Sequence, residues 1–244
     1  MKQIHIFFLS AVLVFAVTAS AKPSKNAGRV VDLKSPDGST ILKATYFAAA
    51  KPGPGVLLFH QSNRTRKSWD DVAHQLVAAG INTLTVDTDP NKTRKQRWPG
   101  DLDAAPEFLG SQSGVKRDVI GIGGAGVLGV EDSVETARRH PAEVKSLVLL
   151  SGETESLDFL RQASQLPELF VAADDDEYPP IVEPMELLYI TASSPSRKFV
   201  HYSSSHEAPW LRYEPFDIGK VPAGGGHGTD MFKVHPELPG IIVD

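Results

Sequence analysis

The sequence contains no cysteine, and this absence removes several kinds of chemistry at once. Disulfide bonds, thiolate metal sites and cysteine nucleophiles are excluded, so the fold has to rest on its hydrophobic core. Long basic runs are also lacking, since the densest is Lys92–Arg97 and the formal net charge is −5. We therefore predict no nucleic-acid partner and interpret residues 92–97 as a solvated loop.

Only one long apolar run is present, and it lies at the N-terminus. Lys2 precedes the run from Ile4 to Val17, and Ala19-Ser20-Ala21 supplies the small residues of a cleavage site. This is the pattern of a secretory signal peptide, and the run is shorter than the ~20 apolar residues that a spanning helix needs. We predict a signal peptide over residues 1–21, a secreted or periplasmic protein, and no stable membrane anchor after cleavage.

The rest of the chain, residues 22–244, reads as one domain of the α/β class. Hydrophobic residues make up 41% of the sequence, which is enough for one sizeable core. Strand-like and helix-like stretches alternate after a hairpin signal at Pro36-Asp37-Gly38, and this order predicts a mostly parallel sheet with helices on both faces and an antiparallel N-terminal hairpin. The predicted strands cover residues 29–33, 41–47, 55–60, 81–87, 118–123, 144–150, 168–173 and 197–202. The predicted helices cover residues 68–79, opened by a capping box at Ser68, then 99–109, 130–140, 157–165, 180–192, and one or two helices within 229–243.

Polar or glycine-rich segments follow the ends of several predicted strands, where ligands bind in open α/β sheets. These segments are HQSN at 60–63, GIGGAGVLG at 121–129, DDDEYPP at 174–180 and GGGHGT at 224–229. A glycine turn, then an acid, then a histidine is the chain order of the α/β-hydrolase catalytic triad.

Four segments together resemble dienelactone-hydrolase-like α/β hydrolases, and the resemblance covers nearly all of residues 22–244. The segments are AKPGPGVLLFHQSNR, ARRHPAEVKSLVLLSG, DDDEYPP and GGHGTDMF. The resemblance implies the α/β-hydrolase fold and hydrolysis of a small ester, lactone or thioester, without a cofactor or a metal. It further implies that His227 is the catalytic histidine, that Asp175 is the acid, and that the backbone N–H of Gln61 is one oxyanion donor. A shift of one residue in either direction would make Asp174 or Asp176 the acid.

The serine that such enzymes carry between two glycines, in Gly-x-Ser-x-Gly, is missing. Counting back from Gly129 puts the nucleophile position at Val127, with Leu128 supplying the second oxyanion N–H; counting forward from Gly124 puts it at Gly126. Neither side chain can attack a carbonyl.

Three serines and a water molecule are candidates to replace the missing serine as the nucleophile. The serines are Ser62, Ser133 and Ser151, and the water would be activated by His227; Thr229 follows the histidine too closely to face it easily. Two hypotheses follow: a hydrolase with a displaced or aqueous nucleophile, and a non-catalytic relative that binds a small-molecule ligand.

Two other readings of the same residues stay open. The segments Gly121–Gly126 and Gly124–Gly129 both satisfy the G-x-G-x-x-G pattern of dinucleotide sites, with Glu153 as the ribose acid. A metal site could draw on the scattered histidines His201, His206, His227 and His235, although their spacing matches no tight ligand motif.

Aromatic residues between 203 and 226, namely Trp210, Tyr213 and Phe216, are equally consistent with a lid over the site and with a self-packed loop.

Overall fold

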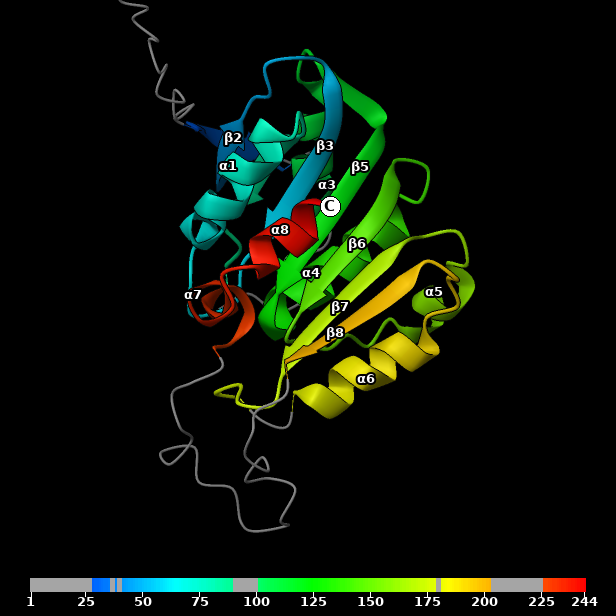
Figure 1. The fold of residues 1–244 in the computed structure, drawn as a ribbon. Coiled ribbons are helices and arrows are strands. Elements are labelled where there is room, and N and C mark those ends of the chain that lie inside the picture. Colours follow the sequence, from blue (N-terminus) through cyan, green and yellow to red (C-terminus); the bar gives the residue numbers. More distant parts are fainter. Residues whose placement is uncertain (1–27, 36–37, 39–40, 90–100, 179–180, 203–225) are drawn as a thin grey trace, which may run out of the picture.

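One sheet of eight strands forms the centre of the molecule (Figure 1). The computed structural model describes residues 28–35, 38, 41–89, 101–178, 181–202 and 226–244. The strands are β1 (Arg29–Lys34), β2 (Ile41–Phe47), β3 (Gly53–Phe59), β4 (Asn82–Val86), β5 (Val115–Ala125), β6 (Val144–Leu150), β7 (Glu168–Ala173) and β8 (Arg197–Tyr202). The helices are α1 (Asp70–Ala78), α3 (Asp101–Ser111), α4 (Gly126–Arg139), α5 (Leu157–Gln162), α6 (Val182–Thr191), α7 (Met231–Val234) and α8 (Leu238–Val243), with short 3₁₀ turns η1 (Arg66–Trp69) and η4 (Gly228–Asp230).

The sheet is antiparallel at one edge and parallel elsewhere, as the sequence predicts. Its order is β1-β2-β4-β3-β5-β6-β7-β8, with β1 antiparallel to β2 and β2 antiparallel to β4. The pairs from β4 across to β8 are all parallel. The β1–β2 hairpin pairs Lys34 with Ile41 across the predicted turn, where Gly38 has a φ of +71°.

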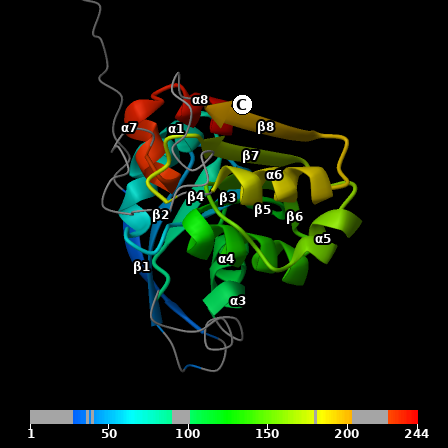
Figure 2. The same cartoon turned by 90° about the horizontal axis from the view of Figure 1, so that it is seen from below.

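Helices cover both faces of the sheet (Figure 2). Each face has its own apolar core. On one face the buried residues of α3, α4 and α6, such as Leu109, Val134 and Met185, pack on the sheet. On the other face Val72 of α1, Met231 of α7 and Leu238 of α8 do so. Among the described residues no helix has the length and apolar character to cross a membrane.

The largest departures from the predicted elements occur where helices begin. The sequence predicts that α4 starts at Val130, but it starts at Gly126, directly after the strand and without an intervening loop. The predicted capping box at Ser68 is wrong: Ser68 lies in η1, its hydroxyl has no hydrogen-bond partner, and Trp69 is the N-cap of α1. The start of α1 is held by Trp69 and not by a capping side chain. Trp69 is buried, and its indole N–H donates to the carbonyl of Phe59 at 3.0 Å.

Candidate active site at the carboxyl ends of the strands

The junction of β5 and α4 is a sharp turn at Gly126. This residue has a φ of +64°, a left-handed conformation that glycine adopts without steric cost. Val127, the other candidate for the nucleophile position, already belongs to the helix and is 41% exposed. The sharp turn that a nucleophile elbow requires therefore lies at Gly126 and not at Val127. If residue 126 is the elbow, the residue after it is Val127 and not Leu128, and the Val127 N–H lies in the first turn of α4, where it lacks an intrahelical acceptor.

His227 faces this turn and is paired with a carboxylate behind it. Its Nδ1 lies 2.9 Å from Oδ1 and 3.1 Å from Oδ2 of Asp176. Asp176 is fully buried and also accepts the N–H of Tyr178 at 2.8 Å through Oδ1. The prediction that Asp175 is the partner of His227 is corrected to Asp176. The reason is that the turn after β7 starts with a hydrogen bond from the Asp176 N–H to the carbonyl of Ala173, which directs the third acid of the run inwards.

Asp174 makes a different contact at the edge of the sheet. Its Oδ1 lies 2.5 Å from Nε2 of His201 on β8. The three acids therefore occupy three different environments, because Asp174 pairs with β8, Asp175 is half-buried and Asp176 meets His227.

The turn at Gly126, His227 and the loop after β3 that carries Gln61, where one oxyanion donor is predicted, are in close contact. A Cβ atom on Gly126 would lie 3.0 Å from Nε2 of His227 and 2.6 Å from Cβ of Gln61. Nε2 of His227 is therefore directed at the position from which a nucleophilic side chain would project. That position is nevertheless too crowded for any side chain unless the backbone of Gln61 shifts.

The side chain of Gln61 ties the oxyanion loop to the histidine loop. Its amide nitrogen donates to the carbonyl of His227 at 2.7 Å. Its amide oxygen accepts the N–H of Thr229 at 3.0 Å and the hydroxyl of Thr229 at 2.8 Å. Gly228, between His227 and Thr229, has a φ of +54°, and a Cβ there would lie 2.7 Å from the Gln61 amide oxygen. The contact between Gln61 and these two residues therefore requires glycine at position 228. Three buried hydrogen bonds thus hold His227 relative to residue 61.

A second histidine, His60, supports the same loop from inside. It accepts the N–H of Thr88 through Nε2 at 3.0 Å, so its Nδ1 carries the proton and donates to the carbonyl of Gln61 at 2.7 Å. Burial lowers the pKa of His60, which keeps the ring neutral. The ion pair between Arg66 and Asp87 lies beside it.

The rim of the site combines an aromatic ring with a charged pair. Tyr178, which is 48% exposed, packs its ring edge-on against His227 with the centroids 4.7 Å apart. Arg64 pairs with Asp230, just after the histidine. Burial opposes ionisation of Asp230, but hydrogen bonds from Lys233 and Arg64 hold its pKa below the ordinary value. The sequence does not single out Tyr178, Arg64 or Asp230, because ring and ion-pair contacts between distant loops leave no local pattern.

Among the described residues, the hydroxyl groups considered as nucleophiles make no contact that prepares them for attack: two bond elsewhere, Ser62 is exposed, and the buried hydroxyl of Ser133 has no hydrogen-bond partner. Ser151 is buried, has a φ of +48°, and its hydroxyl faces the sulfur of Met231 at 3.8 Å. Ser133 is buried within α4, Thr229 donates to Gln61, and Ser62 is exposed. Within the described residues no hydroxyl hydrogen-bonds to Nε2 of His227.

Tight packing accounts for the glycines that match the dinucleotide pattern. A Cβ on Gly124 would meet the carbonyl oxygen of Gly129 at 2.0 Å, and a Cβ on Gly129 would meet the carbonyl oxygen of Phe59 at 2.7 Å. These glycines allow α4 to lie against β3 and β5. No group of three or more potential metal ligands occurs in the part of the chain that the structure describes. His206, Trp210, Tyr213, Phe216, the basic run at 92–97 and the predicted signal peptide lie outside the described residues.

Neither a protein-family model nor a curated protein sequence matches the chain. Solved structures do share its fold. A dienelactone hydrolase from Anabaena variabilis superposes with a TM-score of 0.62 at 16% identity, covering 90% of this chain and 96% of that one. A dienelactone hydrolase-like promiscuous phosphotriesterase from metagenomic libraries gives 0.60 at 16% identity, covering 88% and 97%. EstE1, a thermophilic carboxylesterase from a metagenomic library, gives 0.58 at 18% identity, covering 83% and 87%. The chain therefore has the α/β-hydrolase fold, and its structural neighbours are dienelactone-hydrolase-like proteins and other esterases of that fold.

Proposed function

We propose that the protein hydrolyses a small ester, lactone or thioester by direct attack of water, with His227 as general base. The observation that carries this proposal is the direction of His227. Its Nε2 points at Gly126, where related enzymes carry an attacking side chain and this chain has none. An oriented base with no attacking side chain in front of it suits a water nucleophile, which need not occupy the Cβ position that Gln61 crowds.

Asp176 sets the protonation pattern that this role needs. A carboxylate that accepts the Nδ1 proton leaves the lone pair on Nε2, and it stabilises the imidazolium that forms when the base takes a proton. Burial of Asp176 and its bond to the Tyr178 N–H hold the carboxylate in place. The three bonds of Gln61 fix the histidine backbone in the same way.

The reaction then proceeds in two steps. Water gives a proton to Nε2 of His227 as its oxygen bonds to the carbonyl carbon. The developing oxyanion accepts hydrogen bonds from the backbone N–H groups of Gln61 and Val127. The imidazolium next returns the proton to the leaving oxygen or sulfur as the bond to the carbonyl carbon breaks, which releases an acid and an alcohol or thiol. General-base action contributes about 10²- to 10⁴-fold. Oxyanion stabilisation and binding add about 10³- to 10⁴-fold over water.

The test is turnover of p-nitrophenyl acetate and butyrate by the purified chain and by His227→Ala. We expect slow steady turnover without a burst of p-nitrophenol, no labelling by a fluorophosphonate, and loss of turnover in His227→Ala. His140→Ala is the matched control, because His140 also pairs with a carboxylate, Asp103, at 2.9 Å but lies away from the elbow. Turnover that survives in His227→Ala, or a burst from an acyl-enzyme, contradicts the mechanism.

The crowding at the elbow favours a second candidate function, non-catalytic binding of the same class of carbonyl compound. A Cβ at residue 126 would come within 2.6 Å of Gln61, so the loop occupies space that an active serine would need. If this candidate is correct, the protein is inert towards both esters but binds a ketone analogue of the butyrate ester saturably. His227→Ala then weakens that binding.

We also propose that residues 1–21 direct export. The run from Ile4 to Val17 and the small residues at 19–21 support this proposal. N-terminal sequencing of the protein expressed in a bacterial host with a secretion pathway is expected to find Lys22 as the first residue. A mature protein that retains Met1 contradicts it.

A further inference from the structure

We propose that a hollow between α4, β6 and α5 binds a small amphipathic carboxylate, a molecule with an apolar body and one carboxylate group. The hollow has a volume of about 510 Å³. It lies at the amino ends of β6 and β7, whereas His227 lies near the carboxyl ends of the parallel strands. Its size falls in the range of about 300–1,000 Å³ that is common for small-molecule sites.

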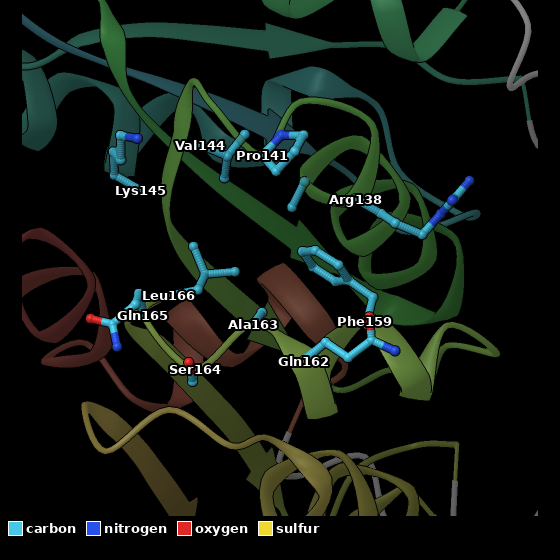
Figure 3. Close-up of a pocket in the computed structure, with 11 residues that line it drawn as sticks. Arg138, Pro141, Val144, Lys145, Phe159, Gln162, Ala163, Ser164, Gln165 and Leu166 are labelled. Atoms are coloured by element: carbon cyan, nitrogen blue, oxygen red, sulfur yellow. The ribbon is translucent and has the colours of Figure 1, made fainter.

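The floor of the hollow is apolar (Figure 3). Ala137, Val144 and Leu166 are buried at its base, and the half-buried ring of Phe159 forms one side. Removal of a ligand's hydrocarbon surface from water against such a floor is worth about 25 cal/mol per Å² of area buried. The floor therefore selects for an apolar ligand body.

The rim carries two cations and no acid. Figure 3 shows Lys145 and Arg138 at opposite ends of the hollow, and the remaining polar lining residues are two glutamines and a serine. Arg138 is already neutralised, because its Nε and Nη2 each donate to an oxygen of Glu135 at 2.7 Å. Lys145 instead donates to the carbonyl of Ala142 at 2.6 Å, and no described carboxylate lies within ion-pair distance of its ammonium group.

The charge at one end thus determines which ligand group is favoured there. An ammonium that bonds only a neutral carbonyl keeps N–H groups free for an anion, and a carboxylate complements it. Neutral amphiphiles would gain the apolar contact alone. The combination of floor and rim favours a monocarboxylate with a chain or ring long enough to reach Phe159.

The experiment titrates the full chain with decanoate by calorimetry and by methyl NMR. We expect saturable binding with the largest shifts at Val144 and Leu166. Ala163→Trp, which places a ring inside the hollow, is expected to weaken binding at least ten-fold. Lys145→Ala is expected to weaken the affinity for decanoate about two- to five-fold, as for the loss of an exposed ion pair, and to leave the affinity for decanol unchanged. Lys116→Ala is the control, since Lys116 is also an exposed lysine in second position of a parallel strand.

Three results would overturn the proposal. They are no saturable binding of decanoate, shifts confined to residues around His227, and equal loss of decanoate and decanol affinity in Lys145→Ala. The methyl shifts of the unmodified protein decide the location even if Ala163→Trp fails to fold. The site is independent of hydrolysis, because binding can be measured in His227→Ala.

Discussion

Restoring a serine at the elbow tests the geometry of the whole site. In Gly126→Ser the new Cβ would project towards His227, 3.0 Å from Nε2, so the hydroxyl beyond it would fall within hydrogen-bond reach of the base. The structure also predicts that this serine is costly. A non-glycine residue in the left-handed region costs about 1–2 kcal/mol, and the 2.6 Å approach to Cβ of Gln61 adds about 1–3 kcal/mol of overpacking.

We therefore expect Gly126→Ser to lose about 2–5 kcal/mol of unfolding free energy. For a domain of this size that corresponds to a fall in Tm of about 4–20 °C. Denaturant unfolding gives the free energy. Labelling by a fluorophosphonate reports whether the hydroxyl has become nucleophilic. The substituted protein is expected to be labelled at residue 126 and to show a burst of p-nitrophenol, whereas the parent shows neither.

Val127→Ser is the matched control, one residue further along. Its side chain is exposed and already helical, so a serine there is expected to change stability by less than about 1 kcal/mol and to remain unlabelled. Labelling of Val127→Ser instead of Gly126→Ser would refute the placement of the elbow. A Gly126→Ser protein as stable as the parent would refute the crowding, and a folded one that resists labelling would refute the direction of His227.

The remaining predictions concern the acid, the loop clamp and a buried carboxyl. Asp176→Asn is expected to lower ester turnover about 10²-fold or more, whereas Asp175→Asn changes it less than two-fold; the reverse order in a steady-state assay would restore the sequence-based assignment. Gln61→Ala removes the buried acceptor of both the Thr229 N–H and the Thr229 hydroxyl, while the His227 carbonyl keeps the N–H of Asp230, so urea unfolding should show a loss of about 2–4 kcal/mol; a loss below about 1 kcal/mol would contradict the clamp. Burial raises the pKa of Glu168 from 4.5 to about 7, so the folded state binds the extra proton and stability falls as pH rises from 4.5 to 7. Glu168→Gln should therefore exceed the parent by up to about 3 kcal/mol at pH 8 and match it near pH 4, and a difference independent of pH would contradict this.

The sequence by itself determines the architecture, because each element carries a local periodic signal. Apolar runs such as residues 144–150 and 168–173 become parallel strands at the predicted residues, and β1 and β2 pair antiparallel as the predicted hairpin. The chain order of turn, acid and histidine also predicts that His227 and an acid of the 174–176 run lie near the glycine turn, and they do.

Only the tertiary structure decides which residue of each short run occupies the site. Three consecutive acids are equivalent in sequence, and the turn that follows β7 selects Asp176. Gly126 and Val127 are equally consistent with the spacing, and the positive φ at the strand–helix junction selects Gly126. The contacts of Gln61 with the histidine loop, 166 to 168 residues away, leave no trace in local sequence. The physical reason is that periodicity reports which face of an element is buried, whereas register within a turn depends on contacts between segments that meet only in the folded chain.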